Sequence, residues 1–182
     1  MSWVGKFHRS SVLFIIGIVS VHWPTVAGAQ SLHPRSLDFS PGIHVYAYDG
    51  AAHRSAEHYE NLCRIVMTEF GLPTDSISVA LVFVDAKLQE KLNTNNRERF
   101  QSLSWYGVCI SPSLIIMLGE DESDDTFMHE YLHSLNHRGL LFTDIRPIEV
   151  HRLIEINEGL LLGSRSYLEY LKTKPKEYQG TR

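Results

Sequence analysis

The sequence predicts an α+β domain in which a small mixed β-sheet packs against helices. Short apolar and β-branched runs, typical of strands, lie between longer segments whose apolar residues recur every three or four positions, as on one face of a helix. The predicted order of elements is β-α-β-α-β-β-α-α. A chain of 182 residues is long enough for one domain with a well-formed core, even if its N-terminal segment is removed.

The first predicted strand covers residues 43–48, which alternate between apolar and polar side chains and lie between two glycine-containing turns. Residues 51–70 have the apolar spacing of a helix, and Gly71 marks its end. Residues 77–84 form a nearly continuous apolar run, which predicts a buried strand. Residues 86–92 predict a short helix.

Two further strands are predicted at residues 105–110 and 114–118, followed by an acidic run at residues 120–125. That run lacks the glycine and the spacing of an EF-hand calcium loop. We interpret it as a loop that ends in a helix N-cap, where the helix dipole favours carboxylates. The sequence then predicts helices at residues 126–137 and 148–172, and Pro147 before the second fits the first turn of a helix.

The N-terminal segment predicts export. Two basic residues precede an apolar run at residues 11–21, and Ala27-Gly28-Ala29 follows as a small-residue cleavage pattern. An uncleaved membrane anchor is the alternative, but the run is shorter than the roughly 17–25 residues that span a bilayer. We therefore expect residues 1–29 to be a signal peptide. Residues 30–182 then form a single secreted or periplasmic domain with no stable membrane anchor.

The charged and sulfur-containing residues narrow the possible functions. The chain has 17 Lys and Arg against 21 Asp and Glu, a net charge of −4, and shows no basic patch of the kind that nucleic-acid binding requires. Cys63 and Cys109 could form one disulfide in an exported protein. Each also lies in an apolar segment, where a buried free thiol is common. Both alternatives stay open at this point.

The sequence His129-Glu130-Tyr131-Leu132-His133 has the form H-E-x-x-H and lies in a predicted helix. Two histidines four residues apart lie on one helix face and can bind the same Zn²⁺, with one ion expected per chain. Glu130, beside the first of them, can act as general base on a water activated by the metal. The alternative is a coincidental motif on the helix of a small exported structural domain, with no metal.

Glu158 is the best candidate for the third zinc ligand. On a helix it lies in an apolar stripe with Ile154, Leu161 and Leu162, where an unpaired carboxylate would cost several kcal/mol. A metal ion would provide the missing partner.

Other partners and other ligands for this position stay open. A salt bridge from Glu158 to Arg152 or Arg165 is the alternative that involves no metal. Glu155 and then His137 are the next candidate ligands. The pattern H-E-x-x-H-x-x-G-x-x-H, which would provide a third histidine, fails at both of its remaining fixed positions.

The motif H-E-x-x-H followed by Asn157-Glu158-Gly159 resembles the gluzincin zinc peptidases, the thermolysin-like and aminopeptidase-like group. The resemblance implies a minimal zincin-like domain in which His129, His133 and Glu158 bind zinc and Glu130 is the general base. It also implies a peptide or protein substrate that adds as a β-strand to the edge of the sheet, for which residues 114–118 are the candidate.

The sequence departs from this family in ways that suggest a second interpretation. Leu162 stands where thermolysin-like enzymes carry an acidic residue that orients a histidine. The group that stabilises the transition state is also not identified; the candidates are Tyr167, Tyr170, His151 and Arg165. The main expectation is an exported zinc metallopeptidase. The alternative is a catalytically inactive zinc-binding module of the same fold that holds a peptide or protein partner.

Overall fold

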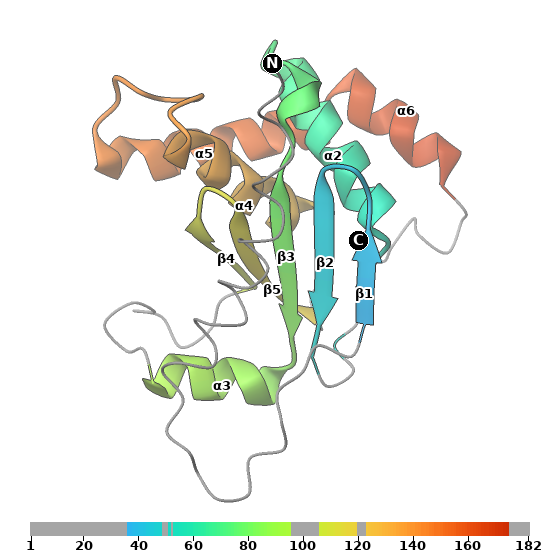
Figure 1. Ribbon diagram of the computed structural model, residues 1–182. Coiled ribbons are helices and arrows are strands. Elements are labelled where there is room, and N and C mark those ends of the chain that lie inside the picture. Colours follow the sequence, from blue (N-terminus) through green and yellow to red (C-terminus); the bar gives the residue numbers. More distant parts are fainter. Residues whose placement is uncertain (1–35, 49–50, 52, 96–105, 120–122, 175–182) are drawn as a thin grey trace, which may run out of the picture. The chain divides into compact units, whose positions relative to one another are not determined.

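The computed structural model describes residues 36–48, 51, 53–95, 106–119 and 123–174 (Figure 1). The expected signal peptide, its cleavage site and residues 120–122 of the acidic run lie outside the described residues. Among the helices in the described ranges, none has the length and apolarity needed to cross a lipid bilayer.

The strands form one five-stranded mixed sheet with the order β1-β2-β3-β5-β4. Strands β2, β3 and β5 are parallel to one another, and β1 and β4 pair antiparallel at the two edges. The mixed α and β architecture expected from the sequence is therefore confirmed. The bounds of the strands are β1 Ser36–Phe39, β2 Ile43–Ala47, β3 Val79–Val84, β4 Gly107–Ser111 and β5 Leu114–Leu118.

The prediction that residues 114–118 form the edge of the sheet is wrong. These residues are β5, which lies between β3 and β4. The tight connection through Pro112 and Ser113 folds β4 back on the outer side of β5, so β4 is the edge strand. The sequence also did not identify β1, a four-residue strand.

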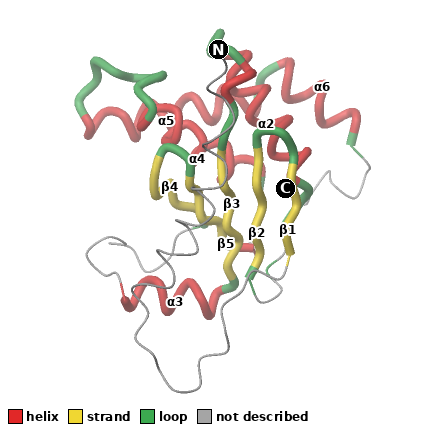
Figure 2. Tube along the Cα trace, in the orientation of Figure 1, coloured by secondary structure: helices red, strands yellow, loops and turns green. Residues whose placement is uncertain are grey.

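Helices α2 and α4 pack on the sheet, α2 against β1 and β2 and α4 against β4 and β5. Helix α5 packs against α4, and α6 packs against α2 and α5 (Figure 1). The loop that joins α4 to α5 lies beside α5 (Figure 2). The bounds are α2 Ala56–Glu69, the 3-10 helix η1 Thr74–Ser76, α3 Ala86–Asn95, α4 Asp124–His137, α5 Pro147–Leu162 and α6 Arg165–Thr173.

Serine caps decide where three of the helices begin. Ser55, Ser123 and Ser164 accept the backbone N–H groups of His58, Thr126 and Tyr167. The helix predicted at residues 51–70 therefore begins at residue 56. The single helix predicted at residues 148–172 is two helices, because α5 ends at Leu162 and the Ser164 cap starts α6 in a new direction.

Both cysteines are free thiols, so the disulfide alternative is wrong for this structure. Cys63 is fully buried in the core between α2 and the sheet. Cys109 is half-buried on β4, where burial and the nearby charge of Glu130 raise the pKa of its thiol to about 12. The Cys109 thiol is therefore protonated at neutral pH in the metal-free protein.

Candidate metal centre

Three histidines from two helices come together. The rings of His129 and His133, one turn apart on α4, have centroids 5.0 Å apart. His151 on α5 faces both, with ring centroids 5.1 Å from His129 and 5.4 Å from His133. One nitrogen from each ring can be chosen so that all three lie within 4.8 Å of one another. We call His129, His133 and His151 the histidine cluster.

The amphipathic pattern of α4 places this cluster between the helices. Phe127, Met128, Tyr131, Leu132 and Leu135 are fully buried and belong to the hydrophobic core. The two histidines of the motif, four residues apart, share a different stripe of α4 that faces α5. The burial of one helix face therefore holds the imidazoles against α5, close to the surface.

Two carboxylates of α5 lie behind the cluster. Glu158 Oε2 is 2.8 Å from Nδ1 of His129, and both side chains are mostly buried. Glu155 Oε1 is 3.4 Å from Nε2 of the exposed His151. The partner of Glu158 is therefore a histidine of the motif. The direct ligand role of Glu158 stays a prediction.

Glu130 points the other way, toward the edge strand. Its carboxylate is buried, and Oε2 accepts the backbone N–H of Cys109 on β4 at 2.7 Å. Burial and the nearby Glu158 raise the pKa of Glu130, while the charge of His129 and the hydrogen bond from Cys109 act against this. A carboxyl group with a raised pKa is better matched to taking up a proton near neutral pH.

Gly107 allows β4 to approach α4 this closely. A Cβ atom at this position would lie 2.8 Å from Cγ of Glu130 and 2.9 Å from Cγ2 of Thr126, well inside van der Waals contact. Glycine here therefore positions the edge strand directly over the general-base candidate. The sequence placed both residues but did not predict their contact.

The donor set fits a zinc ion. Burial and the neighbouring histidines His129, His151 and His137 lower the pKa of His133 to about 4. His133 is therefore neutral near pH 7, the form in which imidazole binds a metal. Imidazole nitrogen, with carboxylates close by, is the environment that zinc prefers in catalytic sites.

A pocket of about 480 Å³ opens beside His133 and His151. Its walls come from the C-terminal end of α4, the α4–α5 loop and the first turn of α5. Apart from the histidines, its described lining is apolar or neutral. The lining residues are His133, Asn136, His137, Gly139, Phe142, Thr143, Ile145, Pro147, Val150 and His151.

A second polar cluster lies at the first turn of α4. Asp124 accepts hydrogen bonds from Tyr167 (2.9 Å) and Lys174 (3.3 Å), and it contacts His58 (2.9 Å) and Arg54. Burial acts to raise the pKa of Asp124. The hydrogen bond and charge of His58, with the charges of Lys174 and Arg54, lower it far below its usual range. We call these five residues the Asp124 cluster.

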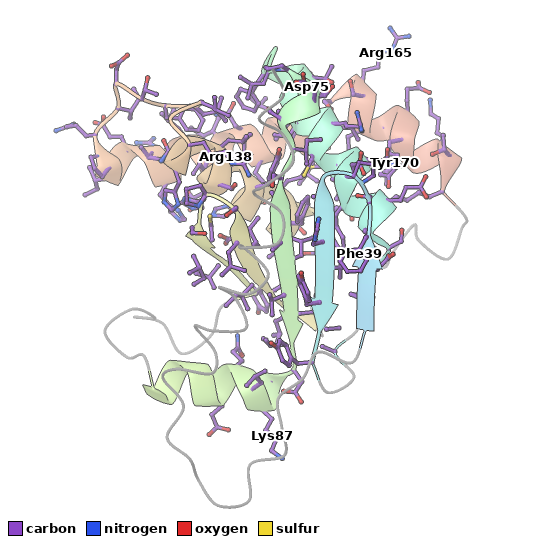
Figure 3. All side chains as sticks on the ribbon, viewed as in Figure 1. Phe39, Asp75, Lys87, Arg138, Arg165 and Tyr170 are labelled. Atoms are coloured by element: carbon purple, nitrogen blue, oxygen red, sulfur yellow. The ribbon has the colours of Figure 1, made fainter. Side chains whose placement is uncertain are left out.

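Two of the four candidates for the transition-state group lie in or next to the Asp124 cluster. Tyr167 bonds Asp124, and Tyr170 bonds Nδ1 of His58 at 2.8 Å and lies between α6 and α2 (Figure 3). Arg165 is exposed and projects away from the helices (Figure 3). Of the four, the structure brings only His151 into the histidine cluster.

The sequence of α5 carries a signal for His151 that the H-E-x-x-H motif does not include. His151, Glu155 and Glu158 are spaced at i, i+4 and i+7, so they share one face of α5. His137, the other histidine considered as a ligand, lies farther out, with its ring 6.5 Å from that of His133.

The chain matches no protein-family description, no curated protein and no solved structure. The assignment of a function therefore depends on the chemistry of the two helices and the edge strand described above.

Proposed function

We propose that this protein is an exported zinc-dependent metallopeptidase of zincin-like fold. It hydrolyses peptide bonds with a zinc ion held between α4 and α5 and with Glu130 as general base. The observation that carries the proposal is the combination of two features around one helix. Three imidazoles from α4 and α5 can each direct a nitrogen to one point. Glu130, a buried carboxylate with a raised pKa, directly follows His129 in the sequence.

The protein ligands in this proposal are His129, His133 and a third group from α5, for which the sequence favours Glu158. A bound zinc ion supplies Lewis acidity, which polarises a peptide carbonyl and makes water acidic near neutral pH. The ring orientations are held because each imidazole contacts another ring or a carboxylate.

Glu130 moves the proton. Its Oε2 is held by the Cys109 N–H, so Oε1 is the atom that accepts a proton from the attacking water. The same oxygen then donates this proton to the leaving amine. The raised pKa of Glu130 supports both steps, because a base that holds its proton moderately well can also return it.

The edge of the sheet and the pocket support a peptide as the substrate. Strand β4 is antiparallel to β5 and lies at the edge next to α4, where an extended peptide can add to the sheet through backbone hydrogen bonds. The neutral pocket beside His133 and His151 suits an uncharged side chain of that peptide. Secretion or residence in the periplasm follows from the signal peptide expected at residues 1–29.

The test is hydrolysis of a mixed peptide library by zinc-loaded wild type and a Glu130→Gln variant, with products identified by mass spectrometry. We expect wild type to cleave, and Glu130→Gln to lose about 10²–10⁴-fold in rate while it retains zinc. Glu169→Gln is the matched control, because Glu169 is exposed on α6 in a surface pair with Lys172. It should cleave as wild type does.

Undiminished cleavage by Glu130→Gln would contradict the role of Glu130. Bound zinc without cleavage of any peptide would instead favour the alternative, a zinc-binding module that holds a peptide or protein. The Leu162 departure from the family pattern is the feature that motivates this alternative.

A further inference from the structure

The distances within the histidine cluster distinguish a metal ligand from a group behind a ligand. In a tetrahedral zinc site with ligand bonds of about 2.0–2.1 Å, two ligand atoms lie roughly 3.3–3.4 Å apart. Nδ1 of His151 and Nε2 of His133 are 3.3 Å apart, which matches this spacing. Oε2 of Glu158 and Nδ1 of His129 are 2.8 Å apart, which is the length of a hydrogen bond.

We propose that His151 is the third protein ligand of the zinc ion. Glu158 and Glu155 then lie at the ring nitrogens of His129 and His151 that do not bind the ion. This inference rests on the zinc site of the proposed function, and it assigns the ligands differently from the family pattern. Glu158 accepts the N–H of His129 at Nδ1, which leaves Nε2 of that ring for the ion. Glu155 lies next to Nε2 of His151, which leaves Nδ1 for the ion.

The assignment of His151 as a ligand also gives both Glu155 and Glu158 of α5 a role, which the assignment of Glu158 as the third ligand does not. Histidines that bind metals commonly donate their second N–H to a carboxylate, which sets the tautomer and the ring orientation. Glu158 is such a carboxylate for His129, and Glu155 lies 3.4 Å from Nε2 of His151 on the same face of α5. Leu162 therefore need not be acidic, because Glu158 already orients a ring of the motif.

A site with three imidazole ligands also leaves one coordination position open. Three protein ligands with a fourth position open to water is the arrangement of catalytic zinc sites. His151 is more than half exposed, so the side of the cluster that it forms faces solvent and the neighbouring pocket. Substrate can then reach the open position without a movement of α4, which the core holds in place.

The test compares zinc binding by the purified full chain as wild type, His151→Ala, His151→Gln and Glu158→Gln. Zinc retention after loading and desalting is measured together with X-ray absorption at the zinc edge, which counts the bound imidazoles. We expect three imidazoles in wild type and in Glu158→Gln, with zinc affinity about 10–100-fold weaker in the latter, as for loss of an outer group. His151→Ala and His151→Gln should both lose stoichiometric zinc while they remain folded.

His137→Ala is the matched control for removal of a histidine, because its ring is farther from His133 than that of His151. It should retain zinc as wild type does. Two imidazoles in wild type, with zinc retained in the His151 variants and lost in Glu158→Gln, would overturn the proposal in favour of Glu158 as the ligand. Wild type without zinc would overturn it as well.

This experiment separates the coordination from the activity. A site with three imidazoles in a protein that cleaves no peptide would leave the ligand assignment standing and contradict the proposed peptidase. Cleavage that depends on Glu130, in a site with two imidazoles, would support the proposed peptidase and contradict the assignment of His151 as a ligand.

Discussion

The two polar clusters of α4 differ in how their charges are balanced. At the first turn of the helix, the Asp124 carboxylate contacts His58, Arg54 and Lys174 and accepts the Tyr167 hydroxyl. Further along the helix, the histidine cluster brings three imidazole rings together, with His133 stacked on His151 and His129 edge-on to His151, and carboxylates lie on the outer side. The first cluster joins acceptors to donors. The second brings three imidazole nitrogens close enough together to hold one metal ion, as we propose.

The difference shows how a buried polar group can be recognised as structural or functional. The Asp124 cluster joins α2, α4 and α6, and its low carboxyl pKa follows from the opposite charges around it. In the histidine cluster, burial and then the neighbouring histidines lower the pKa of His133, so its ring is neutral near pH 7 and has a nitrogen lone pair available. We interpret the first as a stabilising contact and the second as a binding site.

The substitution with the largest expected effect on stability is at Asp124. Asp124→Asn removes the negative partner of three groups that can be cationic, and loss of one member of a buried pair costs about 3–5 kcal/mol in the free energy of unfolding. Urea unfolding measures this. Asp125→Asn is the control, because Asp125 is exposed in the same turn of α4 and its change should cost less than about 1 kcal/mol. Equal losses in the two variants would contradict the structural role of Asp124.

The pH dependence of the free energy of unfolding is a second test of the structural role of Asp124. The folded pKa of Asp124 is lowered, so its contribution is complete above its unfolded pKa of about 4 and is lost as pH falls through the folded value. In metal-free protein, the free energy of unfolding should therefore fall below pH 4. The slope from this one group is up to about 1.4 kcal/mol per pH unit. A profile for Asp124→Asn that is as steep as that of wild type would show that other groups cause the acid sensitivity.

A smaller effect is expected at Gly107, where the edge strand meets the general base. The added methyl group of Gly107→Ala must displace Glu130 or Thr126, at a cost of roughly 1–3 kcal/mol in stability. A misplaced base should also lower the rate of hydrolysis by about 10–100-fold with zinc content unchanged.

The matched control for this substitution is Gly159→Ala. Gly159 has open space around its missing side chain on helix α5. The change should therefore be neutral or stabilise the protein by about 0.5–1 kcal/mol. Full activity and stability in Gly107→Ala would show that the edge strand does not position Glu130.

The sequence predicts local structure well and long-range contacts poorly. The helix of the motif and the β5 strand follow from periodicity and from the Ser123 cap, so they could be placed without coordinates. The order of the strands could not, because it depends on which strand of the β4–β5 hairpin pairs with β3 and which is left at the edge. A four-residue strand such as β1 is too short to show a period.

The same limit applies to the candidate site. His129, Glu130, His133 and Glu158 could be identified because a motif and a buried carboxylate mark them. The spacing of His151, Glu155 and Glu158 marks one face of α5, but whether that face meets the motif depends on the angle at which α5 crosses α4. That angle is set by core packing between the two helices.

The most direct test of the central claim is the zinc content of purified wild type and Asp124→Asn, after loading and desalting, beside a His129→Ala/His133→Ala variant. We expect about one zinc ion per chain in wild type, and the same in Asp124→Asn wherever it is folded, because the Asp124 cluster is not the metal site. The double histidine variant should retain none. Folded wild type that retains no zinc would contradict the account.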